Sequence, residues 1–132
     1  MVIDTSAIVA ILFNEPERVE FDRLINEDEV RLISAVTRVE AAFVIEGRTR
    51  DVGRARLDRF VAFSGIEIVA VSPEQAELAI DAFRRYGKGR HPIGLNIGDC
   101  FSYALAKSTG EPLLFKGDDF SRTDVVPAYR PD

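Results

Sequence analysis

The residues best suited to chemistry in this chain are carboxylates. Four places stand out by their surroundings: Asp4, Glu40, Asp99 and the adjacent pair Asp118 and Asp119. Other common catalytic groups are scarce, because the sequence holds one histidine and one cysteine. It also lacks a phosphate-binding glycine motif of either usual spacing. Any catalysis by this chain should therefore depend on its acids.

Asp4 stands between a strand pattern and a helix pattern. Val2-Ile3 is typical of the end of a buried strand, and residues 7–13 form an apolar run that predicts a helix. Asp4 should therefore lie at the carboxyl end of a strand, where open α/β sheets bind their ligands. The alternative is that Asp4 or Thr5 merely caps the helix.

Glu40 lies within a predicted helix that runs to about Thr49. Val36, Phe43 and Val44 share its helix face. A lone carboxylate on that apolar face would be costly to desolvate unless it is paired or bound to a cation. The alternatives are that Glu40 tilts to solvent, or that it is the capping-box partner of a helix-capping Thr37.

Asp99 comes early in a helix predicted over residues 96–108, and Asn96, one turn before it, could orient its carboxylate. A first-turn acid favoured by the helix dipole is the alternative explanation. Asp118 and Asp119 directly follow a strand pattern at 113–115, where simple turn chemistry would also account for them.

The elements that must position these acids alternate along the chain. Helix patterns separate the strand patterns, which favours a parallel sheet covered by helices on both faces. The strand at 66–71 shows little polar alternation, as expected when both of its faces are covered. The length of 132 residues suits one domain, 1–132. The predicted strands are 2–3, 30–34, 66–71, 113–115 and a short edge strand at 125–126.

Composition narrows the class of protein. The net charge of -5 argues against a protein that coats nucleic acid by bulk electrostatics. It leaves room for a nuclease in which bound cations meet the phosphates. A single cysteine fits a reducing cytoplasm. No signal peptide is visible, and no stretch approaches the roughly 20 apolar residues of a membrane-spanning helix. We therefore expect a cytoplasmic protein.

A parallel sheet would bring the four acidic positions together. Two of them follow strands, and two lie early on helices that start at or pack against the same edge. Unneutralised carboxylates in one cleft would repel each other and raise each other's pKa. Mg²⁺, or Mn²⁺, suits such an all-oxygen site and resolves the conflict. An acidic cluster of this kind fits metal-assisted phosphodiester hydrolysis.

Basic residues offer weaker signals. The segment 84–91 is rich in cations, and Lys88 and Arg90 could contact RNA phosphates while Tyr86 stacks on a base. Lys116 could stabilise developing charge on a phosphate. The alternatives are a solvated helix end for the segment and an ordinary surface lysine for Lys116.

Over essentially its whole length the sequence resembles the PIN-domain ribonucleases, and specifically the VapC-type toxins of bacterial toxin–antitoxin pairs. The resemblance implies a PIN-like three-layer α/β/α sandwich with a mostly parallel sheet of four to five strands. It rests on an ordered set of motifs: Val2-Ile3-Asp4-Thr5-Ser6, Arg38-Val39-Glu40, Leu95-Asn96-Ile97-Gly98-Asp99-Cys100, and Leu113-Leu114-Phe115-Lys116-Gly117-Asp118-Asp119-Phe120 followed by Thr123-Asp124.

The resemblance also implies roles for individual residues. Asp4, Glu40 and Asp99 would hold Mg²⁺, and Asp118 is preferred over Asp119 as the fourth acid. Thr5 or Ser6 would help to position Asp4 or a water molecule at the metal ion. The further implications are an RNA substrate, a homodimer, and an antitoxin protein that blocks the cleft.

Two rival functions remain. In aspartyl-phosphate phosphohydrolases an acid after the first strand is the nucleophile, and a second aspartate usually stands two residues later. Ser6 occupies that position here, which argues against this class. The other rival is a non-catalytic module of PIN-like fold that binds RNA or a protein partner.

Overall fold

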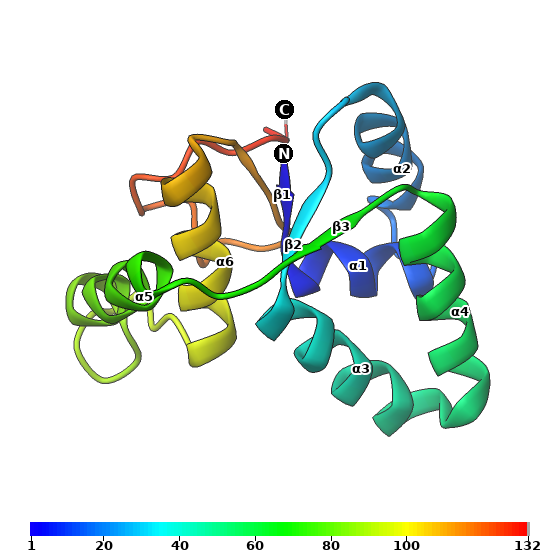
Figure 1. The fold of residues 1–132 in the computed structure, drawn as a ribbon, viewed down its shortest axis with the longest axis horizontal. Coiled ribbons are helices and arrows are strands. Elements are labelled where there is room, and N and C mark those ends of the chain that lie inside the picture. Colours follow the sequence, from blue (N-terminus) through cyan, green and yellow to red (C-terminus); the bar gives the residue numbers. More distant parts are fainter. Residues whose placement is uncertain (132) are drawn as a thin grey trace.

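The sheet at the centre of the fold has four short parallel strands in the order β3-β2-β1-β4 (Figure 1). The computed structural model describes residues 1–131. Val2 is paired with Leu32 on one side and with Leu113 on the other. The strands are β1 (Val2–Ile3), β2 (Leu32–Ser34), β3 (Glu67–Val69) and β4 (Leu113–Leu114).

Six helices cover the two faces of this sheet. Helices α1 to α4 lie on one side and α5 and α6 on the other (Figure 1), which confirms the predicted three-layer α/β/α architecture. No helix within residues 1–131 is long and apolar enough to cross a bilayer. The helices are α1 (Thr5–Leu12), α2 (Arg18–Glu27), α3 (Ala35–Thr49), α4 (Asp51–Phe63), α5 (Pro73–Tyr86) and α6 (Ile97–Thr109).

Alternation along the strands creates two hydrophobic cores. Neighbouring residues of a strand point to opposite faces of the sheet. Ile3, Ile33 and Leu114 therefore pack with α1 to α4, whereas Val2 and Leu113 pack with α5 and α6. All five side chains are fully buried. The central strands are thus held from both sides, and their carboxyl ends form one fixed edge.

Two predictions about strands are wrong. Residues 66–71 were expected to be covered on both faces, but β3 spans only Glu67–Val69 at the border of the sheet, and Ile68 is 46% exposed. Residues 125–126 form no strand. Val126 instead accepts a backbone hydrogen bond from Leu113 (2.8 Å), and Pro127 makes an isolated bridge to Leu113. The apolar pattern of 66–71 identified a strand without showing how far helices would cover it.

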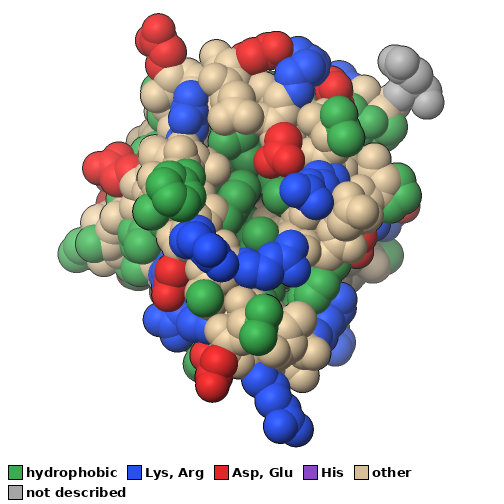
Figure 2. All heavy atoms as spheres, turned by 90° about the vertical axis from the view of Figure 1, so that its right-hand side faces the viewer, with side chains coloured by type: hydrophobic (Ala, Val, Ile, Leu, Met, Phe, Trp, Pro, Cys, Tyr) green, Lys and Arg blue, Asp and Glu red, His purple; other side chains and the backbone are tan. Residues whose placement is uncertain are grey.

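A groove of about 390 Å³ lies between α1, α2 and α4, and we call it the α2–α4 groove. The face of the molecule drawn in Figure 2 has a hollow with hydrophobic side chains inside and Lys or Arg side chains at its border. The groove is lined by Ile11, Leu12, Arg18, Asp22, Arg56, Arg59, Phe60, Phe63 and Ser64.

Candidate active site

Asp4 is buried at the carboxyl end of β1, as predicted. It caps α1, because its Oδ2 accepts hydrogen bonds from the backbone N–H (3.0 Å) and the Oγ–H (2.7 Å) of Ser6. It also continues the sheet edge, since its own N–H donates to the carbonyl of Leu114 (2.9 Å). Its Oδ1 accepts from the Ser102 hydroxyl at 2.6 Å. Three donors thus fix the orientation of this carboxylate.

The hydroxyls behind Asp4 were not identified as site residues from the sequence. Ser102 is fully buried on α6, and its Oγ lies 3.3 Å from the Oγ1 of Thr37, which is fully buried on α3. The spacing of Ser102 from Asp99 was the only signal in the sequence, because it puts both on one side of the helix. The hydrogen bonds from Thr37 to Ser102 and from Ser102 to Asp4 thus connect α3, α6 and the end of β1 behind the site.

Glu40 reaches the same edge from the second turn of α3. Ser34, not Thr37, caps this helix by accepting from the N–H of Val36 (3.1 Å). The capping-box explanation of Glu40 is therefore wrong. The Oε1 of Glu40 accepts from the Thr5 hydroxyl at 2.5 Å. Burial raises the pKa of Glu40, the Thr5 hydrogen bond lowers it, and repulsion from Asp4 raises it further, with a net upward shift.

Gly98 explains how close the first turn of α6 comes to Glu40. A Cβ built on Gly98 would lie 2.0 Å from the Oε2 of Glu40, so only glycine leaves room for the carboxylate at its present place. The positive end of the α6 dipole also faces an anion there, which is a favourable arrangement. A glycine one residue before Asp99 is thus part of the site.

Asp99 is buried in the first turn of α6 and is oriented by Asn96, as predicted. The N–H of Asp99 donates to the Asn96 Oδ1 (2.8 Å), and the N–H of Asn96 donates to the Asp99 Oδ2 (3.0 Å). Burial raises the pKa of Asp99 to about 7, against the lowering effect of the Asn96 bond. Repulsion from Asp4, Asp119 and Glu40 acts in the same upward direction.

The two candidates for the fourth acid lie in different surroundings. Asp119 is exposed and close enough to Asp99 for its charge to raise the pKa of that residue. Asp118 lines a cavity of about 530 Å³ whose other walls include α2 and the C-terminal segment. Its carbonyl accepts from the N–H (3.2 Å) and the hydroxyl (2.7 Å) of Ser121. The effect of Asp119 on Asp99 favours Asp119 as the fourth acid, whereas the resemblance favours Asp118.

The chemistry of this donor set fits a hard divalent cation. Within residues 1–131, Asp4, Glu40 and Asp99 form no ion pair with a lysine or arginine, so their charge is uncompensated. Residues 1–131 contain no group of three or more acidic, histidine or cysteine side chains that is already arranged to coordinate a metal ion. Both oxygens of Asp4 and one oxygen of Glu40 accept hydrogen bonds from serine or threonine hydroxyls.

The three cations proposed to bind RNA differ in availability. The Lys116 Nζ pairs with Glu15 (2.8 Å) and Glu17 (3.3 Å), so its charge is already balanced. Lys88 and Arg90 are exposed in the loop after α5. The structure therefore leaves Lys88 and Arg90 as the better candidates for phosphate contacts.

Known proteins match this chain over nearly its whole length. The sequence profile of the PIN domain family matches residues 1–126. Ribonuclease VapC30 of Mycobacterium tuberculosis is 49% identical over 131 residues, which cover 99% of this chain and 100% of that protein. Ribonuclease VapC of Mycolicibacterium smegmatis is 50% identical over 129 residues, covering 98% and 100%.

Solved structures of similar fold agree with these sequence matches. The crystal structure of Mycobacterium tuberculosis VapC20, described as a sarcin–ricin loop cleaving toxin, has a TM-score of 0.79. The match has 18% identity and covers 98% of each chain. Since a family profile and close relatives both span the chain and the fold agrees, this protein belongs to the PIN-domain family, in its VapC group.

Proposed function

We propose that this protein is a divalent-metal-dependent endoribonuclease that acts as the toxin of a toxin–antitoxin pair. The names of its relatives, which are ribonucleases, support the RNA-cleaving activity. The observation that carries the proposal is the gathering of Asp4, Glu40 and Asp99 at one sheet edge without a cationic partner. Such a cluster is costly by itself, as the raised pKa of Asp99 indicates, and a divalent cation would relieve the cost.

Each residue of the cluster has a task in this proposal. Asp4, Glu40 and Asp99 would hold Mg²⁺ or Mn²⁺, with Asp119 or Asp118 as the fourth acid. When bound, the ion would lower the pKa of a water molecule and offset the negative charge of the phosphate. The supporting residues keep the acids in place: Ser6 and Ser102 hold Asp4, Thr5 holds Glu40, and Asn96 holds Asp99.

The phosphohydrolase alternative lacks its second acid at the site. Ser6 stands where those enzymes carry their second aspartate, and its hydroxyl donates a hydrogen bond to Asp4. The non-catalytic module keeps one observation in its favour, since no finished ion site exists within residues 1–131.

An antitoxin partner is part of the proposal. Solved structures of similar fold include a toxin–antitoxin complex from Klebsiella pneumoniae and VapBC2 from Rickettsia felis bound to a fragment of promoter DNA. We infer that a segment of the antitoxin binds in the α2–α4 groove, which none of the candidate site acids lines. The apolar floor of the groove and its Arg56 and Arg59 suit an amphipathic segment with acidic residues, whereas Arg18 is already paired with Asp22 at 3.6 Å.

A homodimer is likewise proposed from the resemblance. Ile80, Phe83 and Ile97 are exposed on neighbouring surfaces of α5 and α6, around a depression of about 410 Å³ that is almost wholly apolar. A second copy of the chain would remove these side chains from water, which is favourable.

The deciding experiment incubates purified, antitoxin-free protein with labelled RNA in Mg²⁺, in Mn²⁺ and in EDTA. We expect cleavage with either ion and none in EDTA. Asp99→Asn should lose cleavage, whereas Glu74→Gln, which alters a first-turn acid of α5 instead, should cleave normally. Binding of RNA without metal-dependent cleavage would favour the non-catalytic module.

A further inference from the structure

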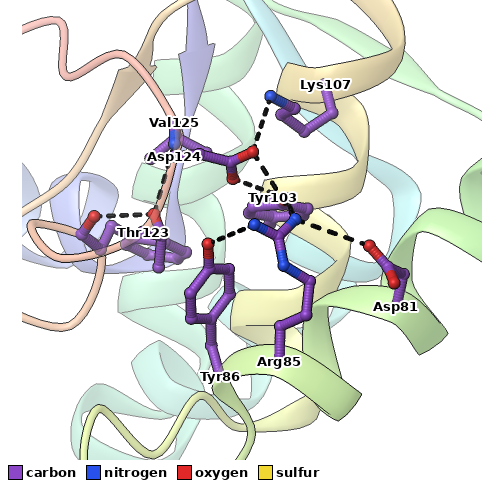
Figure 3. Close-up of polar contacts among 9 residues, drawn as sticks. Asp81, Arg85, Tyr86, Tyr103, Lys107, Thr123, Asp124 and Val125 are labelled. Atoms are coloured by element: carbon purple, nitrogen blue, oxygen red, sulfur yellow. Dashed lines mark hydrogen bonds and ion pairs between the residues drawn. The ribbon is translucent and has the colours of Figure 1, made fainter.

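The segment that carries Asp118 and Asp119 has no helix or strand of its own. Between β4 and residue 126 it consists of turns and bends. A carboxylate on such a segment can be placed accurately only if contacts elsewhere hold the backbone. The segment's far end provides them through Asp124, whose side chain turns toward α6 and α5 (Figure 3).

Asp124 connects this segment to the helix that carries Asp99. Its Oδ1 accepts from the Tyr103 hydroxyl at 2.6 Å, and its Oδ2 accepts from the Lys107 Nζ at 3.1 Å. Both donors belong to α6 and lie one turn apart, on the same side of that helix. Tyr103 in turn lies one turn after Asp99, so one rigid helix holds Asp99 and the anchor of the segment.

Tyr103 is a firm point of attachment. Its side chain is 1% exposed, and a buried tyrosine hydroxyl needs a hydrogen-bond partner. The hydroxyl donates to Asp124 and accepts from the Arg85 Nη1 at 3.2 Å. Arg85 also lies 3.6 Å from the Oδ2 of Asp124 (Figure 3). An exposed ion pair alone would hold little, but a bond to a buried hydroxyl is costly to lose.

Hydrogen bonds within the turn between Phe120 and Thr123 connect Asp124 to the neighbourhood of Asp119. The Thr123 hydroxyl donates to the carbonyl of Phe120 (2.8 Å), and the Thr123 N–H donates to the same carbonyl (3.0 Å). Phe120 is 2% exposed and packs against Phe115, with ring centroids 5.2 Å apart. Asp119 is therefore adjacent to a buried residue that is held from the Asp124 side.

We propose that Asp124 and Tyr103 are positioning residues, which fix Asp119 relative to Asp99 and thereby set the affinity of the site for a divalent ion. The inference rests on the proposed function, because it concerns the same site. It differs from a purely structural role, since it assigns to these residues an effect on ion binding that acts through Asp119.

The test compares Asp124→Ala, Asp124→Asn and Tyr103→Phe with the wild type. Mn²⁺ binding is measured by calorimetry, and the half-saturating Mg²⁺ concentration is measured for RNA cleavage. Residues that hydrogen-bond a metal ligand directly typically contribute 10–100-fold to affinity. Asp124 acts through the backbone of the segment, so Asp124→Ala should weaken Mn²⁺ binding by about tenfold, at the lower end of that range. Tyr103→Phe should weaken it in the same direction while the ring still fills the core.

Two comparisons separate positioning from simple stability. Asp124→Asn keeps an acceptor for the Tyr103 hydroxyl and should recover most of the Mn²⁺ affinity. Asp81→Ala is the matched control, because Asp81 also faces Arg85, at 3.7 Å, but lies on α5 and holds no part of the segment (Figure 3). It should leave Mn²⁺ binding and the Mg²⁺ requirement unchanged.

A double variant tests whether the effect passes through Asp119. If it does, Asp124→Ala should have little further effect on Mn²⁺ binding once Asp119→Asn is present. Additive losses, or a wild-type Mg²⁺ requirement in Asp124→Ala and Tyr103→Phe, would overturn the inference while the proposed function stands. A wild type that neither binds Mn²⁺ nor cleaves RNA would overturn both.

Discussion

Replacing Asp99 with asparagine should stabilise the metal-free protein at neutral and alkaline pH. The asparagine side chain has nearly the same shape and can still accept the hydrogen bond from the Asn96 N–H. What it loses is a buried negative charge near Asp4, Glu40 and Asp119. The change therefore removes repulsion and desolvation cost without leaving an unpaired group.

The size of the effect follows from the pKa of Asp99, which rises from an ordinary 3.8 to about 7 in the folded protein. Between these values the folded state binds more protons than the unfolded state, so stability falls as pH rises. Within this range each pH unit lowers the free energy of unfolding by about 1.4 kcal/mol. Full ionisation of Asp99 therefore lowers it by at most about 4 kcal/mol. Solvent near the site reduces this, and we expect a gain of about 2 kcal/mol.

The assay is urea unfolding in EDTA from pH 5 to pH 8. Asp99→Asn should exceed the wild type in free energy of unfolding at pH 8, and the difference should shrink toward pH 5, where Asp99 is protonated in the folded wild type. Glu74→Gln supplies the control, since it alters a first-turn acid on α5 that is exposed. It should lose a few tenths of a kcal/mol through the helix dipole.

Added Mg²⁺ should reverse the order. Ligands stabilise the state that binds them, so the wild type should gain stability with rising Mg²⁺ while Asp99→Asn gains little. The reasoning is refuted if Asp99→Asn is less stable than the wild type at pH 8 in EDTA, as Glu74→Gln is. Asp99 would then be an ordinary helix-start acid.

Three further predictions concern the rest of the site. Asp119→Asn should reduce Mg²⁺-dependent RNA cleavage far more than Asp118→Asn, because only Asp119 influences Asp99; equal losses in a gel cleavage assay would contradict this. Gly98→Ala should displace the Glu40 carboxylate and reduce cleavage at least tenfold. Thermal unfolding should show that its stability is unchanged or raised by about 0.5 kcal/mol, because alanine favours a helix more than glycine does. Arg90→Ala should lower the salt dependence of RNA binding by about 0.7 in log–log slope if the loop after α5 contacts a phosphate, and an unchanged slope would exclude that contact.

Local sequence was enough to locate three of the acids. An apolar pair before Asp4, apolar neighbours around Glu40 and an asparagine one turn before Asp99 are all patterns within one helical turn or one strand. The alternation of strands and helices then implied a parallel sheet, whose carboxyl edge gathers residues from distant parts of the chain. Fold class and the gathering of Asp4, Glu40 and Asp99 therefore followed from short-range patterns plus one topological rule.

Tertiary packing decided what those patterns could not. Ser102 bonds to Asp4 across 98 positions of sequence, and only the packing of α6 behind β1 brings them together. The choice between Asp118 and Asp119 depends on how a segment without regular structure is turned, and the contacts that turn it come from Tyr103 and Lys107 on another element.

Tertiary packing also determines that one face of β3 is exposed and that Lys116 pairs with Glu15 and Glu17. Hydropathy and residue type indicate whether a side chain can be buried and which chemistry it can perform, and each can be read from the residue itself. Partners across a fold are set by how whole helices and strands pack, which depends on every contact at once. For this protein, the sequence by itself determined which acidic side chains meet at the carboxyl edge of the sheet, and the tertiary structure decided what holds each of them in place.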